Sequence, residues 1–162
     1  MHKINFGSEI TAYTGAEELS PLQAKLLAAA KLAAADAYAP YSNFKVGAAI
    51  LLDDAAETIV LGSNQENAAY PVTICAERVA IYSALTQQPK AKIKKIAITV
   101  ITASGKANRP LSPCGSCRQV IYETELRVGN DIELIMQGDS GEVYVVPTVK
   151  DILPLMFDAS FL

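Results

Sequence analysis

Segments with the pattern of helices alternate with segments with the pattern of strands along most of this chain. Ser20, Pro21 and Gln23 form a typical helix N-terminus, with a serine cap, a proline in the first turn and a glutamine three residues after the cap. This helix is predicted to run to about Tyr38 and to stop before Pro40. Strands are then predicted over 44–52, 57–61, 94–102, 131–136 and 142–146, and helices over 75–85, 117–126 and 148–153.

This order of elements predicts an α/β fold. A mixed sheet with helices on both faces is the economical way to bury alternating helices and strands. We therefore expect a three-layer α/β/α arrangement with a mixed five-stranded sheet, formed by one domain over residues 1–162. Residues 1–19 form a weakly patterned lead-in to which no role is assigned. Ligands in such sheets tend to bind where strand ends meet helix starts.

The composition is that of a folded protein that binds no nucleic-acid polymer. Hydrophobic residues make up 51% of the 162 residues and charged residues 19%, which is unlike a disordered chain. The net charge is −3, and no basic block is present to bind a phosphate backbone. A small neutral ligand such as a nucleoside needs no such charge, so it remains compatible with this composition.

We expect a cytoplasmic location and no membrane contact. The apolar stretch Leu26–Ala37 contains Lys31 and Asp36 and is too short to span a bilayer, and residues 1–10 lack the apolar run of a signal peptide. Thiols stay reduced in the cytoplasm. The three cysteines are therefore interpreted as ligands, nucleophiles or buried side chains rather than as a disulfide framework.

The three cysteines lie in two short segments, both at predicted helix starts. Cys114 and Cys117 have C-x-x-C spacing, which on the first turn of a helix directs both sulfurs to one side. Zinc ligands and redox dithiols share this spacing. Cys75 would complete a set of three thiolates and leave a fourth metal position to water, as in catalytic zinc sites. The single histidine, His2, is a poor candidate for a fourth ligand.

Charged residues beside the cysteines fit a catalytic metal. Three thiolates over-neutralise one zinc ion. Arg78 can compensate by donating hydrogen bonds to the sulfurs, with Arg118 as a further candidate, and two helix N-termini add partial positive charge. Glu77 follows two residues after Cys75, so its carboxylate can reach the open metal position without being a ligand and can transfer protons there. C-x-x-C alone is also compatible with a structural knuckle or a redox pair, but the C-A-E segment and the proline before Cys114 favour catalysis.

Four blocks of the chain, taken together, resemble the small homotetrameric zinc-dependent cytidine deaminases, over about residues 20–157. In order they are APYSNFKVGA (39–48), GSNQENAAYP (62–71), ICAERVA (74–80) and SPCGSCRQ (112–119). The resemblance implies one zinc ion per chain, held by Cys75, Cys114 and Cys117, with Glu77 as the proton shuttle and Arg78 beside the sulfurs.

The resemblance also implies a set of substrate-binding residues. Asn64 and Glu66 match the pair that holds the ribose 3′-hydroxyl, and two residues of an extended segment spaced in this way face the same side. Phe44 matches the aromatic residue that packs against the pyrimidine, and the backbone of Ala76 would bind the base carbonyl. As alternatives, Phe44 could be a core residue, and Asn64 and Glu66 could be turn residues after Gly62.

Two further aromatic residues match positions that this family contributes to a neighbouring subunit's site. They are Tyr70 and Phe157, and their assignment rests on the homotetramer that the resemblance implies. Tyr70-Pro71 could equally form a rigid turn, and Phe157 could merely cover a hydrophobic face. The expected reaction is the hydrolytic deamination of cytidine and 2′-deoxycytidine to uridine and 2′-deoxyuridine, with release of ammonia, in pyrimidine salvage.

Three other functions compete with this one. A deaminase of another aminopyrimidine, such as blasticidin S, is disfavoured because Asn64 and Glu66 presuppose a ribose. A non-enzymatic zinc-binding module would need a closed site with four ligands, and the sequence offers no fourth ligand. A deaminase that edits RNA or DNA is disfavoured by the acidic charge of the chain.

Overall fold

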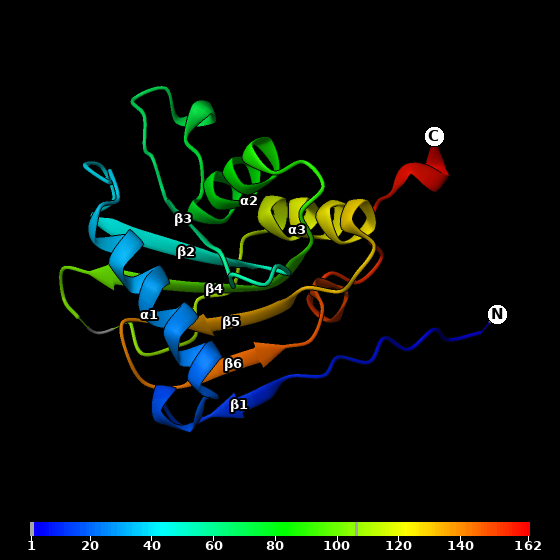
Figure 1. Cartoon of the computed structure of the whole chain (residues 1–162), viewed down its shortest axis with the longest axis horizontal. Helices are drawn as coiled ribbons and strands as arrows, with labels where there is room; N and C mark the ends of the chain where they lie inside the picture. Colours follow the sequence, from blue (N-terminus) through cyan, green and yellow to red (C-terminus); the bar gives the residue numbers. More distant parts are fainter. Residues whose placement is uncertain (1, 106) are drawn as a thin grey trace.

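The computed structural model describes residues 2–105 and 107–162, and these form a mixed sheet with helices on both faces. The strands lie in the order β1-β6-β5-β4-β2-β3 (Figure 1). Only the β4–β5 pair is parallel among the strand pairs of the described residues; the other neighbours are antiparallel. The bounds of the strands are β1 Thr11–Tyr13, β2 Phe44–Leu52, β3 Ile59–Ser63, β4 Ile93–Thr102, β5 Glu133–Gln137 and β6 Val143–Val146.

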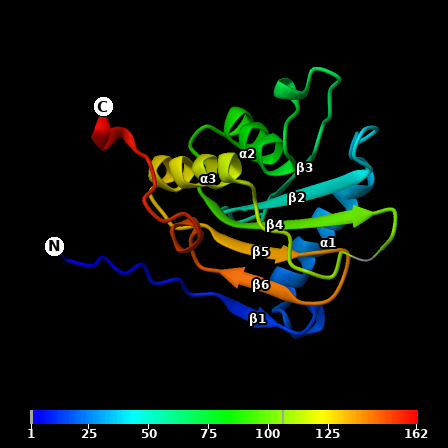
Figure 2. The same cartoon turned by 180° about the vertical axis from the view of Figure 1, so that it is seen from behind.

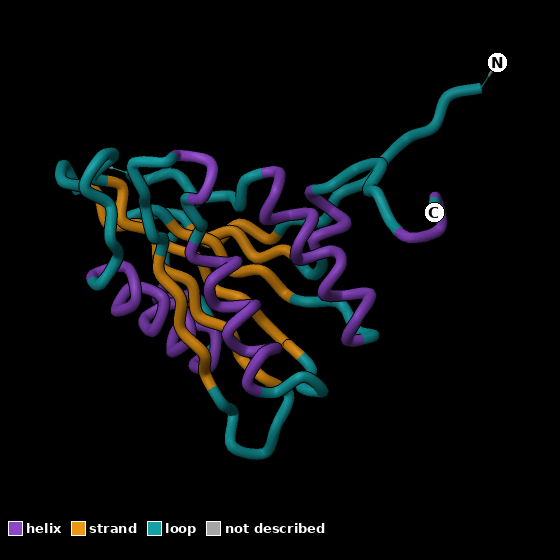
Figure 3. The backbone as a smooth tube through the Cα atoms, turned by 90° about the horizontal axis from the view of Figure 1, so that it is seen from above, coloured by secondary structure: helices purple, strands orange, loops and turns teal. Residues whose placement is uncertain are grey.

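Helix α1 covers one face of the sheet, and α2 and α3 cover the other (Figures 1 and 2). Their bounds are α1 Pro21–Ala35, α2 Ala76–Gln87 and α3 Gly115–Val128. Seen from above, the strands lie between the helices, which confirms the predicted layers (Figure 3). Within the described residues, none of the helices has the length and apolarity needed to cross a bilayer.

The sheet has six strands, so the prediction of five strands is wrong. The additional strand, β1, lies in the lead-in of residues 1–19 and pairs with the edge of β6, with Ala12 opposite Tyr144. It is three residues long, which is too short for an alternating pattern to show in the sequence. Its extended conformation depends on the partner strand, which lies more than a hundred residues away in the sequence.

The start of α1 agrees closely with its prediction, whereas its end does not. The backbone amide of Gln23 donates to Ser20 Oγ at 3.4 Å, and the backbone amide of Ser20 donates to Gln23 Oε1 at 3.1 Å, so both halves of the capping box are present. The helix ends at Ala35, three residues before Tyr38. Tyr38 instead forms an isolated β-bridge with Gln65, and this pairing replaces the last predicted turn.

The near-continuous apolar run of β2 is explained by burial on both faces of the sheet. Ala48, Ile50 and Leu52 belong to the core beneath α2 and α3, whereas Ala49 and Leu51 belong to the core beneath α1. Successive side chains of a strand point to opposite faces, so a strand covered on both sides must be apolar at every position. Strand β2 therefore packs against helices on both faces of the sheet.

Gly62 lets β3 lie directly against the first turns of α2. A Cβ atom at Gly62 would lie 2.5 Å from the carbonyl oxygen of Ala76 and 2.5 Å from the backbone nitrogen of Ala80. Real Cβ atoms do not approach backbone atoms so closely, so glycine is required at this crossing. The close approach fixes the N-terminus of α2, where Cys75 lies.

Candidate functional site

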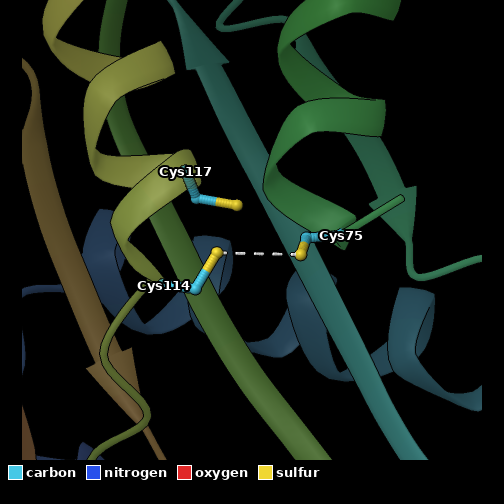
Figure 4. A group of neighbouring side chains, drawn as sticks. All are labelled: Cys75, Cys114 and Cys117. Atoms are coloured by element: carbon cyan, nitrogen blue, oxygen red, sulfur yellow. Dashed lines mark hydrogen bonds between the residues drawn. The ribbon is translucent and has the colours of Figure 1, made fainter. Parts of the chain in front are cut away.

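Three cysteine side chains from two helix starts point toward one another (Figure 4). Cys75 is the N-cap of α2, Cys114 is the N-cap of α3, and Cys117 lies in the first turn of α3. Their Sγ atoms all lie within 4.8 Å of one another, and those of Cys75 and Cys114 are 4.0 Å apart. The prediction that both cysteine segments begin helices is confirmed, and the positive ends of two helix dipoles therefore meet at the sulfurs.

The geometry and chemistry of the cluster fit zinc. Tetrahedral zinc binds sulfur at about 2.3 Å, which places ligand sulfurs about 3.8 Å apart. The 4.0 Å between the sulfurs of Cys75 and Cys114 lies close to this value, and thiolates are the soft ligands that zinc accepts. Within the described residues, no fourth cysteine, histidine or carboxylate joins the cluster. The site is thus an open one with three ligands, as in catalytic zinc centres, and lacks the four ligands of a structural one.

Arg78 compensates part of the negative charge of the sulfurs. Its Nη2 atom lies 3.6 Å from Cys75 Sγ as a hydrogen-bond donor. A hydrogen bond with Cys117, followed by the one with Arg78, lowers the pKa of the Cys75 thiol to about 5. The same bond with Cys75, together with burial, raises the pKa of the Cys117 thiol. Negative charge is therefore accommodated most readily on Cys75, next to the guanidinium.

Arg118 has a different role from the compensation expected for it. Its guanidinium donates to the carbonyl oxygens of Pro113 at 2.8 Å and Ile152 at 2.7 Å, and to Ser112 Oγ at 2.9 Å. These three acceptors are oxygens, so Arg118 fastens the segment before Cys114 to the C-terminal part of the chain. It positions a ligand without donating to a sulfur.

A pocket of about 350 Å³ opens at the cysteine cluster. It brings together residues from β2, from the segment after β3, from the start of α2 and from the segment before α3. Its walls are Ser42, Phe44, Val46, Asn64, Glu66, Thr73, Ile74, Cys75, Glu77, Leu111, Ser112 and Cys114. The pocket thus unites the predicted metal ligands and proton shuttle with the predicted substrate-binding residues Phe44, Asn64 and Glu66.

Glu77 lies in the first turn of α2 and is 4% exposed. Burial raises the pKa of its carboxyl group above the usual value, and the negative charge of Cys75 raises it further. A carboxyl group in this environment takes up and releases a proton more easily near neutral pH than an exposed one. Ala76, directly before it, is fully buried at the helix start, where backbone N–H groups lack partners within the helix.

Asn64 is held in place by the backbone of β2. Its Nδ2 atom donates to the carbonyl oxygen of Phe44 at 3.0 Å, and its Oδ1 atom accepts from the backbone amide of Val46 at 2.7 Å. The amide keeps one N–H and one lone pair for a ligand. Asn64 follows β3 directly and Gln65 forms bridges with Tyr38 and Ile74, so this segment is extended rather than a turn.

Glu66 faces the same pocket and is fixed by the turn before β2. Its Oε2 atom accepts from the backbone amides of Tyr41 at 2.8 Å and Ser42 at 3.3 Å. Its Oε1 atom accepts a short hydrogen bond from the Ser42 hydroxyl. The hydroxyl bond, aided by the two amides, lowers the pKa of the Glu66 carboxyl below its usual value. Glu66 is therefore an ionised acceptor with a fixed orientation.

Phe44 lies on the wall of the pocket rather than in the core. It is the first residue of β2 and is 37% exposed. The central residues of the same strand are fully buried, so its exposure sets Phe44 apart from the core residues that follow it. Its ring is available to a flat ligand that enters the pocket.

Tyr70 and Phe157 are exposed and lie outside the walls of the cysteine pocket, as far as the chain is described. Tyr70 is 71% exposed, makes an edge-on contact with Tyr41 and lines an adjoining hollow of about 370 Å³. Phe157 is 55% exposed and stacks on Phe161. Neither residue reaches the site of its own chain in this arrangement, and their roles stay predictions.

Leu111 and Ser112 are wall residues to which the sequence assigned no role. They precede Cys114 in the segment after β4, and this segment is held by the turn between β5 and β6. Asp139 in that turn accepts from the backbone amides of Thr102 at 2.9 Å and Ala107 at 3.1 Å. Ser112 belongs to the fourth matching block, which is the one signal that could have identified it; Leu111 lies just outside that block.

Comparison with known proteins identifies relatives of the whole fold. Residues 21–129 match the family described as the cytidine and deoxycytidylate deaminase zinc-binding region. A cytidine deaminase of Halalkalibacterium halodurans is 40% identical over 128 residues, which are 76% of this chain and 84% of that protein. A cytidine deaminase of Sporosarcina psychrophila is 46% identical over 99 residues, which are 61% of this chain and 67% of that protein.

Solved structures give the same result. The crystal structure of cytidine deaminase from Burkholderia pseudomallei superposes with a TM-score of 0.68 at 39% identity, covering 82% of this chain and 97% of that one. The crystal structure of cytidine deaminase from Mycobacterium tuberculosis gives a TM-score of 0.61 at 32% identity, covering 83% of this chain and 95% of that one.

Proposed function

This chain belongs to the family of cytidine and deoxycytidylate deaminases, and we propose that it hydrolyses cytidine and 2′-deoxycytidine to uridine, 2′-deoxyuridine and ammonia. It is a zinc enzyme, and the three-cysteine cluster is able to hold the metal. One observation carries the proposal. The buried carboxyl group of Glu77 lies beside the sulfurs in a pocket that is also lined by the aromatic ring of Phe44 and the ionised acceptor Glu66.

The other lining residues of the pocket orient the nucleoside in this proposal. Phe44 packs against the pyrimidine, while Asn64 and Glu66 bracket the 3′-hydroxyl, which donates to the carboxylate and can accept from the free N–H of the amide. The backbone amide of Ala76, at the start of α2, binds the base carbonyl. These contacts place C4 of the base at the end of the pocket where the sulfurs lie.

Glu77 moves the protons of the reaction. Cys75, Cys114 and Cys117 would hold zinc, which would act there as a Lewis acid that makes water easier to deprotonate. Glu77 accepts a proton from the attacking water and transfers it to ring N3, which makes C4 electrophilic as the water oxygen bonds to it. Glu77 then delivers a second proton, from the added hydroxyl, to the amino group. The C4–N bond breaks and ammonia leaves, so the reaction consumes one water per nucleoside.

Two alternatives are less well supported. A deaminase of another aminopyrimidine, such as blasticidin S, has no use for an acceptor as firmly fixed as Glu66. A non-enzymatic zinc module would complete the coordination of the metal with a fourth protein ligand. Within the described residues, the cluster offers three ligands.

We further propose a homotetramer in the cytoplasm that acts in pyrimidine salvage. The exposure of Tyr70 and Phe157 supports a role in a neighbouring subunit's site, because both aromatic side chains lie outside the pocket of their own chain as described. Sedimentation of the purified protein tests the assembly. A stable, fully active monomer would remove the proposed roles of Tyr70 and Phe157.

The proposed reaction is tested by following the loss of cytidine absorbance with protein whose zinc content has been measured. The matched control is Glu77→Gln, which keeps the shape of the side chain and removes its ability to carry a proton. We expect turnover by the native chain and a loss of at least about 100-fold in Glu77→Gln, with zinc retained. Near-full turnover by Glu77→Gln with zinc bound would show that Glu77 is not the proton shuttle. Absence of turnover by the native chain would redirect the search to other aminated heterocycles.

A further inference from the structure

Ser42 connects the two residues on which the proposed function places the base and the ribose. Its hydroxyl donates to Glu66 Oε1, and its Oγ atom accepts from the backbone amide of Phe44 at 3.0 Å. A serine hydroxyl has one donor and two acceptor positions, so both contacts can exist at the same time. The orientation of the carboxylate and the start of β2 are thereby tied to one side chain.

The turn that carries Ser42 holds its hydroxyl in place. The backbone amide of Asn43 donates to the carbonyl oxygen of Ala39 at 3.0 Å, and Asn43 has a φ of 54°, a left-handed conformation that asparagine tolerates better than most residues. Tyr41 is bound through its own amide to Glu66. Ser42 itself is exposed and lines both the cysteine pocket and the adjoining hollow.

The acceptor positions of Glu66 show where a ligand hydroxyl must bind. A carboxylate offers about four lone-pair positions, two on each oxygen. Both positions of Oε2 are used by the amides of Tyr41 and Ser42, and one position of Oε1 is used by the Ser42 hydroxyl. The remaining position is on Oε1. A substrate hydroxyl that donates to Glu66 therefore shares an oxygen with Ser42.

From this arrangement, and resting on the proposed function, we propose that Ser42 is the positioning residue for recognition of the 3′-hydroxyl. Its hydroxyl holds Oε1 in one orientation, with one lone pair directed at the ribose. Without that hydroxyl, Oε1 gains a second free lone pair, for which water competes with the substrate. The carboxylate is then held only by the hydrogen bonds from the two backbone amides and can rotate. The effect requires a hydroxyl on the substrate, so a nucleoside that lacks it should not respond.

The test compares Ser42→Ala with the native chain on cytidine and on 3′-deoxycytidine. For Ser42→Ala we expect kcat/KM for cytidine to fall by about tenfold, and kcat/KM for 3′-deoxycytidine to change by less than about twofold. Ser42→Thr keeps the hydroxyl in an exposed turn and should restore most of the loss. Ser104→Ala removes an exposed serine hydroxyl outside the pocket walls and should leave both values unchanged. Thermal unfolding of each variant checks that the fold is intact.

The outcomes separate this inference from the function on which it rests. An equal fall on both substrates would show that Ser42 only supports the loop, and an unchanged kcat/KM for cytidine would show that Glu66 needs no positioning. Either result overturns the inference while the deamination by the native chain stands. Absence of deamination by the native chain would instead overturn the proposed function.

Discussion

The Sγ atom of Cys75 lies 4.0 Å from that of Cys114, although 39 positions separate the two residues along the chain. Each is the N-cap of its helix, so the contact joins the starts of α2 and α3. A metal bound there links two helices that otherwise share a small interface, and its removal should affect stability as well as activity.

Replacement of Cys117 by serine should abolish zinc binding. Cys117 is buried, and the substitution leaves two thiolates, too few for a stable zinc site. We expect zinc to fall from about one per chain to well below one, with complete loss of turnover. A chelator should lower the unfolding temperature of the native chain but not that of Cys117→Ser. Ser116→Ala, an exposed neighbour, is the control; full zinc content in Cys117→Ser would contradict the ligand assignment.

Substitution of Gly62 by alanine should destabilise the fold and impair the site. The new Cβ would lie 2.5 Å from two backbone atoms of α2, so β3 and α2 would have to separate. We expect a loss of about 1–3 kcal/mol in the free energy of unfolding, measured with denaturant, and a reduced kcat because the start of α2 carries Cys75 and Glu77. Gly7→Ala meets no atom within 4 Å and should be neutral. Equal stabilities of the two variants would show that the crossing can relax.

Replacement of Asp139 by asparagine should remove a pH-dependent contribution to stability. Burial opposes ionisation, but hydrogen bonds from Thr102 and Ala107 outweigh it and hold the pKa of the Asp139 carboxyl below its usual value. The folded state therefore binds fewer protons than the unfolded state in this range. The contribution is complete above the usual value of 3.8 and is lost as the pH falls through the lower folded pKa.

Denaturant unfolding across pH checks this contribution. Near neutral pH, Asp139→Asn should lower the free energy of unfolding by about 1–2 kcal/mol, and the difference from the native chain should narrow toward about pH 3. Glu142→Gln neutralises an exposed carboxylate of the same hairpin and should change stability by less than about 0.5 kcal/mol. A difference that is constant down to the lowest pH would show that ionisation of Asp139 is not involved.

Deletion of residues 2–13 should weaken the fold but spare the chemistry. The deletion removes β1 and leaves the backbone groups of the β6 edge unpaired, which favours self-association. Strand β1 and strand β3 lie at opposite edges of the sheet, and the pocket lies at the β2 and β3 side. We expect an unfolding temperature lower by about 5 °C, increased light scattering and unchanged turnover per zinc. A loss of zinc in the truncated protein would contradict this separation.

Features encoded within a few residues were predictable from the sequence. The Ser20–Gln23 capping box, the C-x-x-C spacing and the position of Glu77 after Cys75 all depend on local geometry, and the structure has them as expected. Features that depend on partners far away in the sequence could not be predicted. Strand β1 requires β6, and α1 ends early because Tyr38 pairs with Gln65.

The candidate site shows the same division. The metal ligands could be identified because cysteine has few other uses in a reduced chain. The hydrogen bonds between Asn64 and the backbone of β2 could not be predicted. Neither could the hydrogen bonds that Arg118 donates to three oxygens. Amide and guanidinium groups bind many partners, and only the folded arrangement selects among them.

Strand β4 lies between α2 and α3 in the sequence, and this order bears on when zinc can bind during folding. In the folded chain, β4 pairs with β2 between the two cysteine segments, and the chain then crosses to α3. Such non-local pairing is slow compared with the formation of single helices. We therefore expect the complete three-sulfur site to form late, so that the zinc content of freshly made protein rises with the fraction of chains whose sheet is complete.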